Sequence, residues 1–156
     1  LLPLHGLAGQ LFSPLAKLLA SNHLVPRLFA WRADDEARVR RLVAGTGSRI
    51  ADADIALYRR RVSDPAHVAG ALAMMANWDL RSLAAELPRL RAPLQLLAAE
   101  HDRTLPPAHA RRVVALLPQA GLTLLPGLGH LAHEEAPQRI FDVLWPLVEK
   151  GHAAAS

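Results

Sequence analysis

The fold is decided by residues 94–137, which read LQLLAAEHDRTLPPAHARRVVALLPQAGLTLLPGLGHLAHEEAP. This segment contains two short apolar runs, residues 94–99 and 121–126, of the kind that suits strands buried on both faces of a sheet. Between them Pro107 opens a predicted helix, one face of which is made by Ala110, Val113, Val114 and Leu117. A strand, a helix and a strand at this spacing predict a βαβ unit with two neighbouring parallel strands.

A chemically useful residue follows each predicted strand. Asp102 comes after the first and His130 after the second. Because the carboxyl ends of neighbouring parallel strands meet at one sheet edge, ~4.8 Å apart, we expect the two side chains to meet. We expect a hydrogen bond of ~2.7–3.1 Å between carboxylate and imidazole. An aspartate on one ring nitrogen leaves the other free to take a proton from a nucleophile, so the pair forms two thirds of a hydrolase triad.

Simpler interpretations of these residues stay open. Asp102 is also placed to cap a turn, and His130 to be an ordinary loop histidine. A metal site is a third interpretation, and it would draw on His101, His109, His130, His133 and Glu134. No spacing among these residues matches a zinc motif, so we predict neither a metal nor a cofactor.

The segments AAEHDRTLPP and LPGLGHLAHEEAP resemble the acid turn and the histidine turn of the α/β-hydrolase superfamily. In that superfamily the histidine follows a glycine and is followed five residues later by Glu, and then by Pro. The residues that match here are Gly129, His130, Glu135 and Pro137. Ala99 departs from the pattern, because the acid turn commonly has glycine at that position. The resemblance implies the catalytic order Ser, Asp, His, with Asp102 second and His130 third, and it leaves His133 outside the matched position.

A nucleophile is not visible in the sequence. There is no Gly-x-Ser-x-Gly motif, and Ser48 in GTGSRI has glycines on one side only and no apolar strand before it. The other serines before the predicted strands suit helix caps or helix positions. We therefore expect the nucleophile to lie upstream of Leu1 and this chain to be catalytically inert by itself. An aspartate nucleophile, as in epoxide or haloalkane hydrolases, stays open.

The first ninety residues predict helices only. Capping residues and apolar spacing favour helices opened by Pro14, by Pro26, by Asp34–Glu36 and by Ser63–Pro65, with others over residues 53–62 and before Pro88. We predict an α/β fold class: residues 1–90 form the helical cap of an α/β-hydrolase fold. Residues 91–156 then form its C-terminal βαβα part, with the last two parallel core strands and flanking helices.

Several phrases of the expected cap closely resemble the magnesium chelatase accessory proteins of bacteriochlorophyll synthesis. They are LHGLAGQLFSPLAKLLA, VPRLFAWRA, LVAGTGSRI, ALYRRRVSDPAHVAGALAMMANWDL and LPRLRAPLQLL. The resemblance implies a role in photosynthetic pigment synthesis, with a small-molecule substrate or tetrapyrrole as ligand and chelatase subunits as partners. A generic serine hydrolase of esters or thioesters, and a non-catalytic tetrapyrrole- or chelatase-binding protein, stay open as alternatives.

Large apolar side chains of the expected cap are candidates for a pocket wall that suits a flat ligand. They are Phe12, Phe29, Trp31, Met74, Met75 and Trp78. Packing in the cap's own core is the alternative for each. The arginines of YRRRV suit either propionate groups or a solvated helix face.

With 51% apolar and 21% charged residues, a net charge of +4 and no cysteine, we expect a cytoplasmic protein without a nucleic-acid partner, whose membrane contact is at most peripheral.

Overall fold

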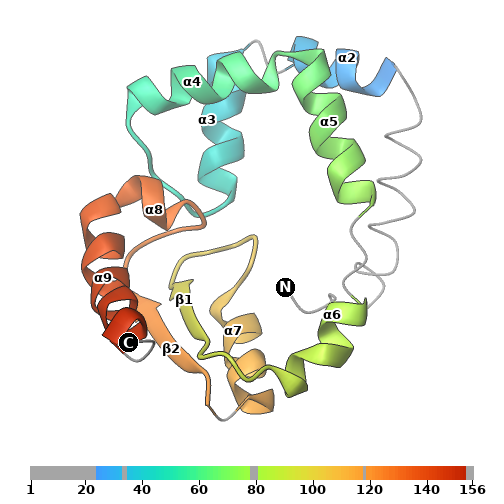
Figure 1. Ribbon diagram of the computed structural model, residues 1–156. Helices are drawn as coiled ribbons and strands as arrows, with labels where there is room; N and C mark the ends of the chain where they lie inside the picture. The colour runs from blue at the N-terminus through green and yellow to red at the C-terminus, as the bar shows by residue number, and fades with distance from the viewer. Residues whose placement is uncertain (1–23, 33–34, 78–80, 118, 154–156) are drawn as a thin grey trace.

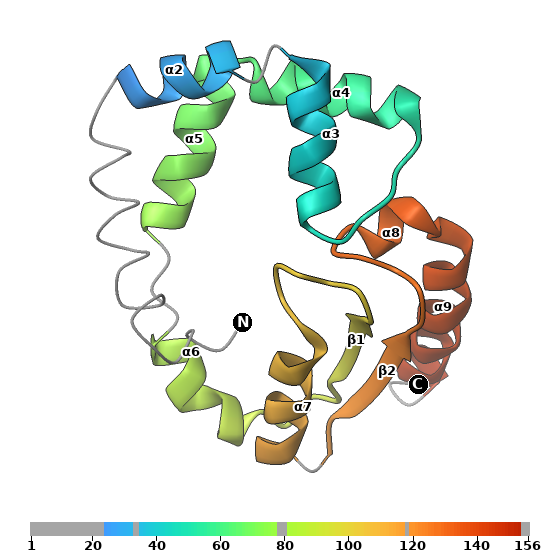
Figure 2. The same ribbon diagram turned by 180° about the vertical axis from the view of Figure 1, so that it is seen from behind.

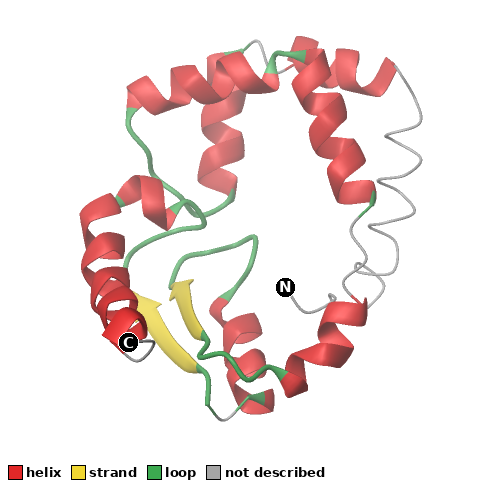
Figure 3. Cartoon of the chain, in the orientation of Figure 1, coloured by secondary structure: helices red, strands yellow, loops and turns green. Residues whose placement is uncertain are grey.

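The computed structural model describes residues 24–32, 35–77, 81–117 and 119–153. Helices come first: α2 (Leu24–Arg32), α3 (Glu36–Gly45), α4 (Asp52–Val62), α5 (Pro65–Ala76), α6 (Arg81–Glu86) and the 3₁₀ helix η1 (Leu87–Arg89). We call these helices, together with the described loops that join them, the helical region. The later elements are β1 (Gln95–Ala99), α7 (Pro107–Leu116), β2 (Gly121–Leu125), α8 (Ala132–Glu135) and α9 (Pro137–Ala153), as Figure 3 shows. No helix among the described residues has the length and apolar character needed to cross a bilayer.

Side-chain caps fix where two helices of the helical region begin. The carboxylate of Asp35 accepts a hydrogen bond from the Ala37 amide at 2.9 Å, at the start of α3. The carboxylate of Asp64 accepts from the Ala66 amide at 2.8 Å, and Pro65 occupies the first position of α5. These contacts satisfy amide groups that have no partner inside a helix. Both predicted helix starts are therefore confirmed.

The two strands pair in parallel, as predicted, with Gln95 opposite Gly121 and Ala99 opposite Leu125. Helices lie on both faces of the sheet (Figure 1). On one face the buried residues Ala99, Leu125, Leu128 and Ala132 form a core with side chains of α9. On the other face Val113, Leu117 and Ala120 form a second core with Leu94 and Leu96. The predicted α/β fold class is confirmed.

The expectation that both strands are buried on both faces is wrong for most of their residues. Full burial is confined to Ala98, Ala99 and Leu125 at the carboxyl ends, and the side chain of Leu124 is 38% exposed. The sheet has two strands in the described part of the chain, so each strand has a neighbouring strand on one side only. On its other side, the side chains of each strand lack the neighbours that a further strand would provide. The best-packed end of the sheet is the end from which the acid and histidine turns leave.

Leu117 is the residue on which the α7 side of the core most depends. It is 1% exposed and contacts Val113 and Ala120, whereas its neighbour Leu116 is 54% exposed. We expect Leu117→Ala to lower the free energy of unfolding by about 3 kcal/mol, because a buried cavity replaces the lost side chain. Leu116→Ala is the matched control and should stay within about 0.5 kcal/mol of the parent. Equal effects of the two changes in urea unfolding would contradict this assignment of the core.

The helices α3 and α4 lie beyond the carboxyl ends of the strands (Figure 1). Their own core consists of Val39, Val43 and Ile55. Leu131, which follows β2, packs against this core although it belongs to the strand half of the sequence. In both Figure 1 and Figure 2, the loop that joins α3 to α4 lies beside the loop that leads into α8. The helical region therefore contacts the sheet edge at which Asp102 and His130 are found.

Candidate active site

The acid turn begins where β1 ends, and Asp102 organises it. One carboxylate oxygen, Oδ1, accepts hydrogen bonds from the amides of Thr104 at 2.8 Å and Leu105 at 2.7 Å. The Asp102 amide itself donates to the Ala99 carbonyl at 3.2 Å. Two amide donors on one oxygen hold the carboxylate in a single orientation. The turn-capping interpretation of Asp102 is therefore correct for this oxygen.

The second carboxylate oxygen contacts the histidine turn. Oδ2 of Asp102 lies 2.9 Å from Nδ1 of His130, so the predicted hydrogen bond is present. The Asp102 side chain is 11% exposed and that of His130 is 31% exposed. Because a carboxylate only accepts hydrogen bonds, Nδ1 carries the proton and Nε2 keeps its lone pair in the neutral ring. Among the described residues, no side chain makes a hydrogen bond to Nε2.

The backbone around His130 is held by two glutamates. The carboxylate of Glu100 accepts from the Gly127 amide at 2.9 Å, and that of Glu135 accepts from the Gly129 amide at 2.8 Å. The His101 amide adds a bond to the Leu128 carbonyl at 2.8 Å, which joins the acid turn to the histidine turn directly. Hydrogen bonds to charged acceptors are the stronger kind, so this turn is well fixed.

His133 lies away from this pair. Its side chain is 66% exposed, and its Nε2 lies 3.5 Å from a carboxylate oxygen of Glu134. Within the described residues, no three histidine, aspartate or glutamate side chains converge as metal ligands would. The structure thus brings His130 to Asp102 and places His133 on the surface.

Ser48, in the loop between α3 and α4, contacts the histidine turn, and this contact was not among the predictions from sequence. It is 3% exposed, and its Oγ accepts a hydrogen bond from the Leu131 amide at 2.8 Å. Leu131 directly follows His130 in the chain. The glycines before Ser48 in GTGSRI were the available signal, since they indicate a close backbone approach at that turn.

Tyr58 on α4 makes a second contact of this kind. Its hydroxyl donates to a carboxylate oxygen of Glu134 at 2.7 Å. Burial, and then the hydrogen bond to Glu134, raise the pKa of Tyr58 to about 12. Both causes favour the neutral phenol, because ionisation would put a second negative charge beside the carboxylate.

We expect the Tyr58 hydroxyl to ionise at a higher pH than an ordinary tyrosine, and the free energy of unfolding to depend on pH in the alkaline range. Its contribution to stability is fully present below its unfolded pKa of 10.0 and is lost as the pH rises towards about 12. Since Tyr58 is the single tyrosine of the chain, the ultraviolet absorbance of phenolate reports it directly. Glu134→Gln, which removes the charge but keeps an acceptor oxygen, should lower the midpoint. A midpoint at the ordinary value in the unmodified chain would show that the contact is absent in solution.

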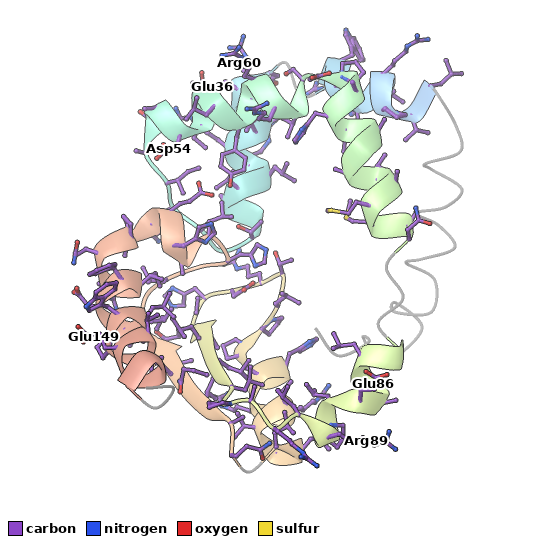
Figure 4. The ribbon with its side chains drawn as sticks, in the orientation of Figure 1. Glu36, Asp54, Arg60, Glu86, Arg89 and Glu149 are labelled. Atoms are coloured by element: carbon purple, nitrogen blue, oxygen red, sulfur yellow. The ribbon has the colours of Figure 1, made fainter. Side chains whose placement is uncertain are left out.

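Four of the six candidate pocket residues lie on α2 and α5, two helices that pack together. Phe29 and Trp31 on α2 are 59% and 73% exposed, and Met74 on α5 is 55% exposed. Met75 is partly buried, and Phe12 and Trp78 lie outside the described residues. Packing in the core of the helical region does not account for the three exposed side chains. Arg60 of the YRRRV segment points outward from α4 (Figure 4) and is exposed.

The sequence model of the alpha/beta hydrolase family matches residues 2–143, nearly the whole chain. The chain belongs to the alpha/beta hydrolase family. The order found here, strand, acid turn, helix, strand and histidine turn, agrees with this membership, and the resemblance predicted from the sequence is confirmed.

One curated relative of this hydrolase-family chain is the magnesium-chelatase 30 kDa subunit of Rhodobacter capsulatus. It is 37% identical over 144 residues, which cover 92% of this chain and 50% of the subunit. A shorter match, 44% identical over 55 residues, covers 33% of this chain and 3% of the polyketide synthase ThaQ of Burkholderia thailandensis. The chain therefore spans half the length of the chelatase subunit and a small part of the synthase.

Proposed function

We propose that this chain supplies the acid and the histidine of a Ser-Asp-His hydrolase that serves as a magnesium chelatase accessory protein in bacteriochlorophyll synthesis. The observation that carries the catalytic part is the 2.9 Å hydrogen bond between Asp102 and His130 at the carboxyl ends of the strands. The pigment-synthesis part is supported by the 37% identity to a protein named as a magnesium-chelatase subunit.

In this proposal each half of the Asp102 carboxylate has its own task. Oδ1 is held by the amides of Thr104 and Leu105, and Oδ2 accepts a hydrogen bond from the protonated Nδ1 of His130. Nε2 then removes the proton from the nucleophile and later gives it to the leaving group. Asp102 stabilises the imidazolium that forms between these two steps. The substrate class is a small ester, thioester or amide.

The nucleophile in this proposal is a serine upstream of Leu1. The sequence contains no Gly-x-Ser-x-Gly motif, and the chain covers half the length of its chelatase-subunit relative. Residues 1–90 are then the helical cap, and residues 91–156 are the C-terminal βαβα part of the hydrolase core. The contact of α3 and α4 with the histidine turn supports a cap over the sheet edge where the substrate reacts.

The test uses the full-length protein and this 156-residue chain in parallel. The full-length protein should hydrolyse an activated phenyl ester and should be labelled by a fluorophosphonate, which reacts with activated serines. The 156-residue chain should do neither, because loss of a triad nucleophile costs on the order of a million-fold in turnover. The catalytic proposal fails if the full-length protein shows neither hydrolysis nor labelling. Labelling of the 156-residue chain would instead show that it contains its own nucleophile.

A tetrapyrrole-binding role that needs no catalysis is the second candidate, and the exposed Trp31, Phe29 and Met74 favour it. Large flat ligands suit such side chains, and chelatase subunits are the partners that this role implies. We expect protoporphyrin to quench tryptophan fluorescence in the full-length protein, and His130→Ala to leave that binding intact. A Trp31/Trp78 double substitution should weaken protoporphyrin binding in a separate absorbance titration. Unchanged affinity in that variant would remove this candidate.

A further inference from the structure

We propose that Ser48 is a positioning residue for His130, and that the turn of residues 46–48 is the part of the helical region that sets the geometry of the acid–histidine pair. This inference rests on the proposed role of His130 as the general base. It assigns a task to a residue that neither touches the reacting atoms nor belongs to the sheet.

The turn first contacts the acid side. The Arg103 amide, next to Asp102, donates to the Thr46 carbonyl at 3.1 Å. Gly47 has a positive φ of 88°, and a Cβ at that position would overlap the carbonyl oxygen of His101. Only glycine adopts this conformation at so short an approach without strain. The backbone on either side of Asp102 is thus in direct contact with residues 46 and 47.

The same turn contacts the histidine side. A Cβ on Gly129 would overlap the carbonyl of Gly47 and would lie 2.5 Å from the Ser48 amide nitrogen. The Ser48 hydroxyl accepts from the Leu131 amide at 2.8 Å. Residues on both sides of His130 are therefore fixed against residues 47 and 48. The turn of residues 46–48 thus contacts both catalytic turns, which are also joined directly by the hydrogen bond from the His101 amide to the Leu128 carbonyl.

The Ser48 contact is buried, so its loss should disturb the histidine turn more than the loss of an exposed hydrogen bond would. Ser48 is 3% exposed, so its hydroxyl and the Leu131 amide that it accepts from are shielded from bulk water. A buried amide without a partner costs about 1–3 kcal/mol, and the backbone moves to reduce that cost. The amide concerned belongs to Leu131, so the movement passes directly to His130. The side chain of Leu131, packed against the core of α3 and α4, adds a second anchor at the same residue.

A direct catalytic role is the competing interpretation of Ser48. Its Oγ already accepts from the Leu131 amide, and the hydrogen bond found on the His130 ring within the described residues is the one to Asp102. A nucleophile needs its hydroxyl exposed to substrate and hydrogen-bonded to the base. Burial and the amide contact favour positioning over nucleophilic attack.

The test compares Ser48→Ala, Ser48→Thr and Ser63→Ala in the full-length protein. Ser63 is a matched control, because its buried Oγ has no hydrogen-bond partner in the described part of the chain. The first readout is the low-field proton resonance of the His130 Nδ1–H group, assigned by its loss in His130→Ala. We expect Ser48→Ala to broaden or remove it, Ser48→Thr to restore it, and Ser63→Ala to leave it unchanged. This readout needs no turnover, so it stays valid if the hydrolase proposal fails.

The second readout is ester hydrolysis. Ser48→Ala should lower kcat by about 10- to 100-fold at an unchanged KM, the size of effect that a small misplacement of a catalytic group produces. If Ser48→Ala does not fold, Ser48→Cys replaces it, since sulfur fills the site but accepts only weakly. A folded Ser48→Ala protein with an unchanged resonance and unchanged kcat overturns the proposal. A million-fold loss, together with fluorophosphonate labelling at Ser48, overturns it in favour of a nucleophile.

Discussion

Replacing His130 by alanine in the full-length protein is expected to reduce kcat for ester hydrolysis about a million-fold, the loss typical for the histidine of a triad. The reason is specific to the geometry. Asp102 fixes Nδ1 as the protonated nitrogen, so in the proposed mechanism Nε2 is the atom that accepts the nucleophile's proton. Without the ring, the hydroxyl of the proposed serine would stay protonated at neutral pH and would be a poor nucleophile. Only binding and oxyanion stabilisation would then remain.

His133→Ala is the matched control for this experiment. It removes the same type of side chain three positions further along, from a site that is 66% exposed and away from Asp102. Its kcat and KM should equal those of the parent protein. An equal loss in both variants would mean that the turn, rather than the His130 ring, is what activity requires. Full activity in His130→Ala would end the triad assignment.

Replacing Gly47 by alanine is expected to cost about 4–5 kcal/mol of folding free energy, one of the largest effects a single substitution has. The positive φ of 88° accounts for about 1–2 kcal/mol of this in a residue with a Cβ. The remainder comes from overlap with the His101 carbonyl, which is backbone and cannot rotate away as a side chain does. The acid turn would have to move for the chain to fold.

Gly127→Ala separates these two contributions. Gly127 also has a positive φ, 74°, but a Cβ there would meet nothing within 4 Å. Its substitution should therefore show the conformational cost alone, about 1–2 kcal/mol in denaturant unfolding. The difference between the two variants measures how tightly residue 47 packs against the acid turn. If both lose the same amount, the close approach of these turns does not hold in solution.

The parts of the fold and site that were predictable from sequence depend on local patterns. Asp35 and Asp64 mark helix starts because their side chains cap amides two residues away. Asp102 and His130 were predictable as a pair because two parallel neighbouring strands fix where the following residues lie. The short helix α8 has too few residues for an apolar period to show.

The contacts that sequence reasoning missed join residues far apart in the chain. Ser48 and Leu131 are separated by 83 positions, and Tyr58 and Glu134 by 76. Both depend on how the helical region folds back over the sheet edge. The glycines before Ser48 indicate a close approach at that turn, but no local pattern identifies the partner residue. The burial of the strands was misjudged for a related reason. An apolar run shows that a strand can be covered on both faces, but the neighbouring elements decide whether it is.

The turn of residues 46–48 has a consequence for anyone who recombines members of this family. In sequence, the helical region ends near residue 90 and the strands follow it, so residue 90 is the natural junction for a chimera. In space they interlock through Gly47 and Ser48 on one side and Gly129 and Leu131 on the other. A transplanted set of helices must therefore bring this turn to a recipient whose histidine turn also has glycine before its histidine. A chimera that places a side chain at position 47 or 129, or that removes the hydroxyl at position 48, should have a displaced histidine.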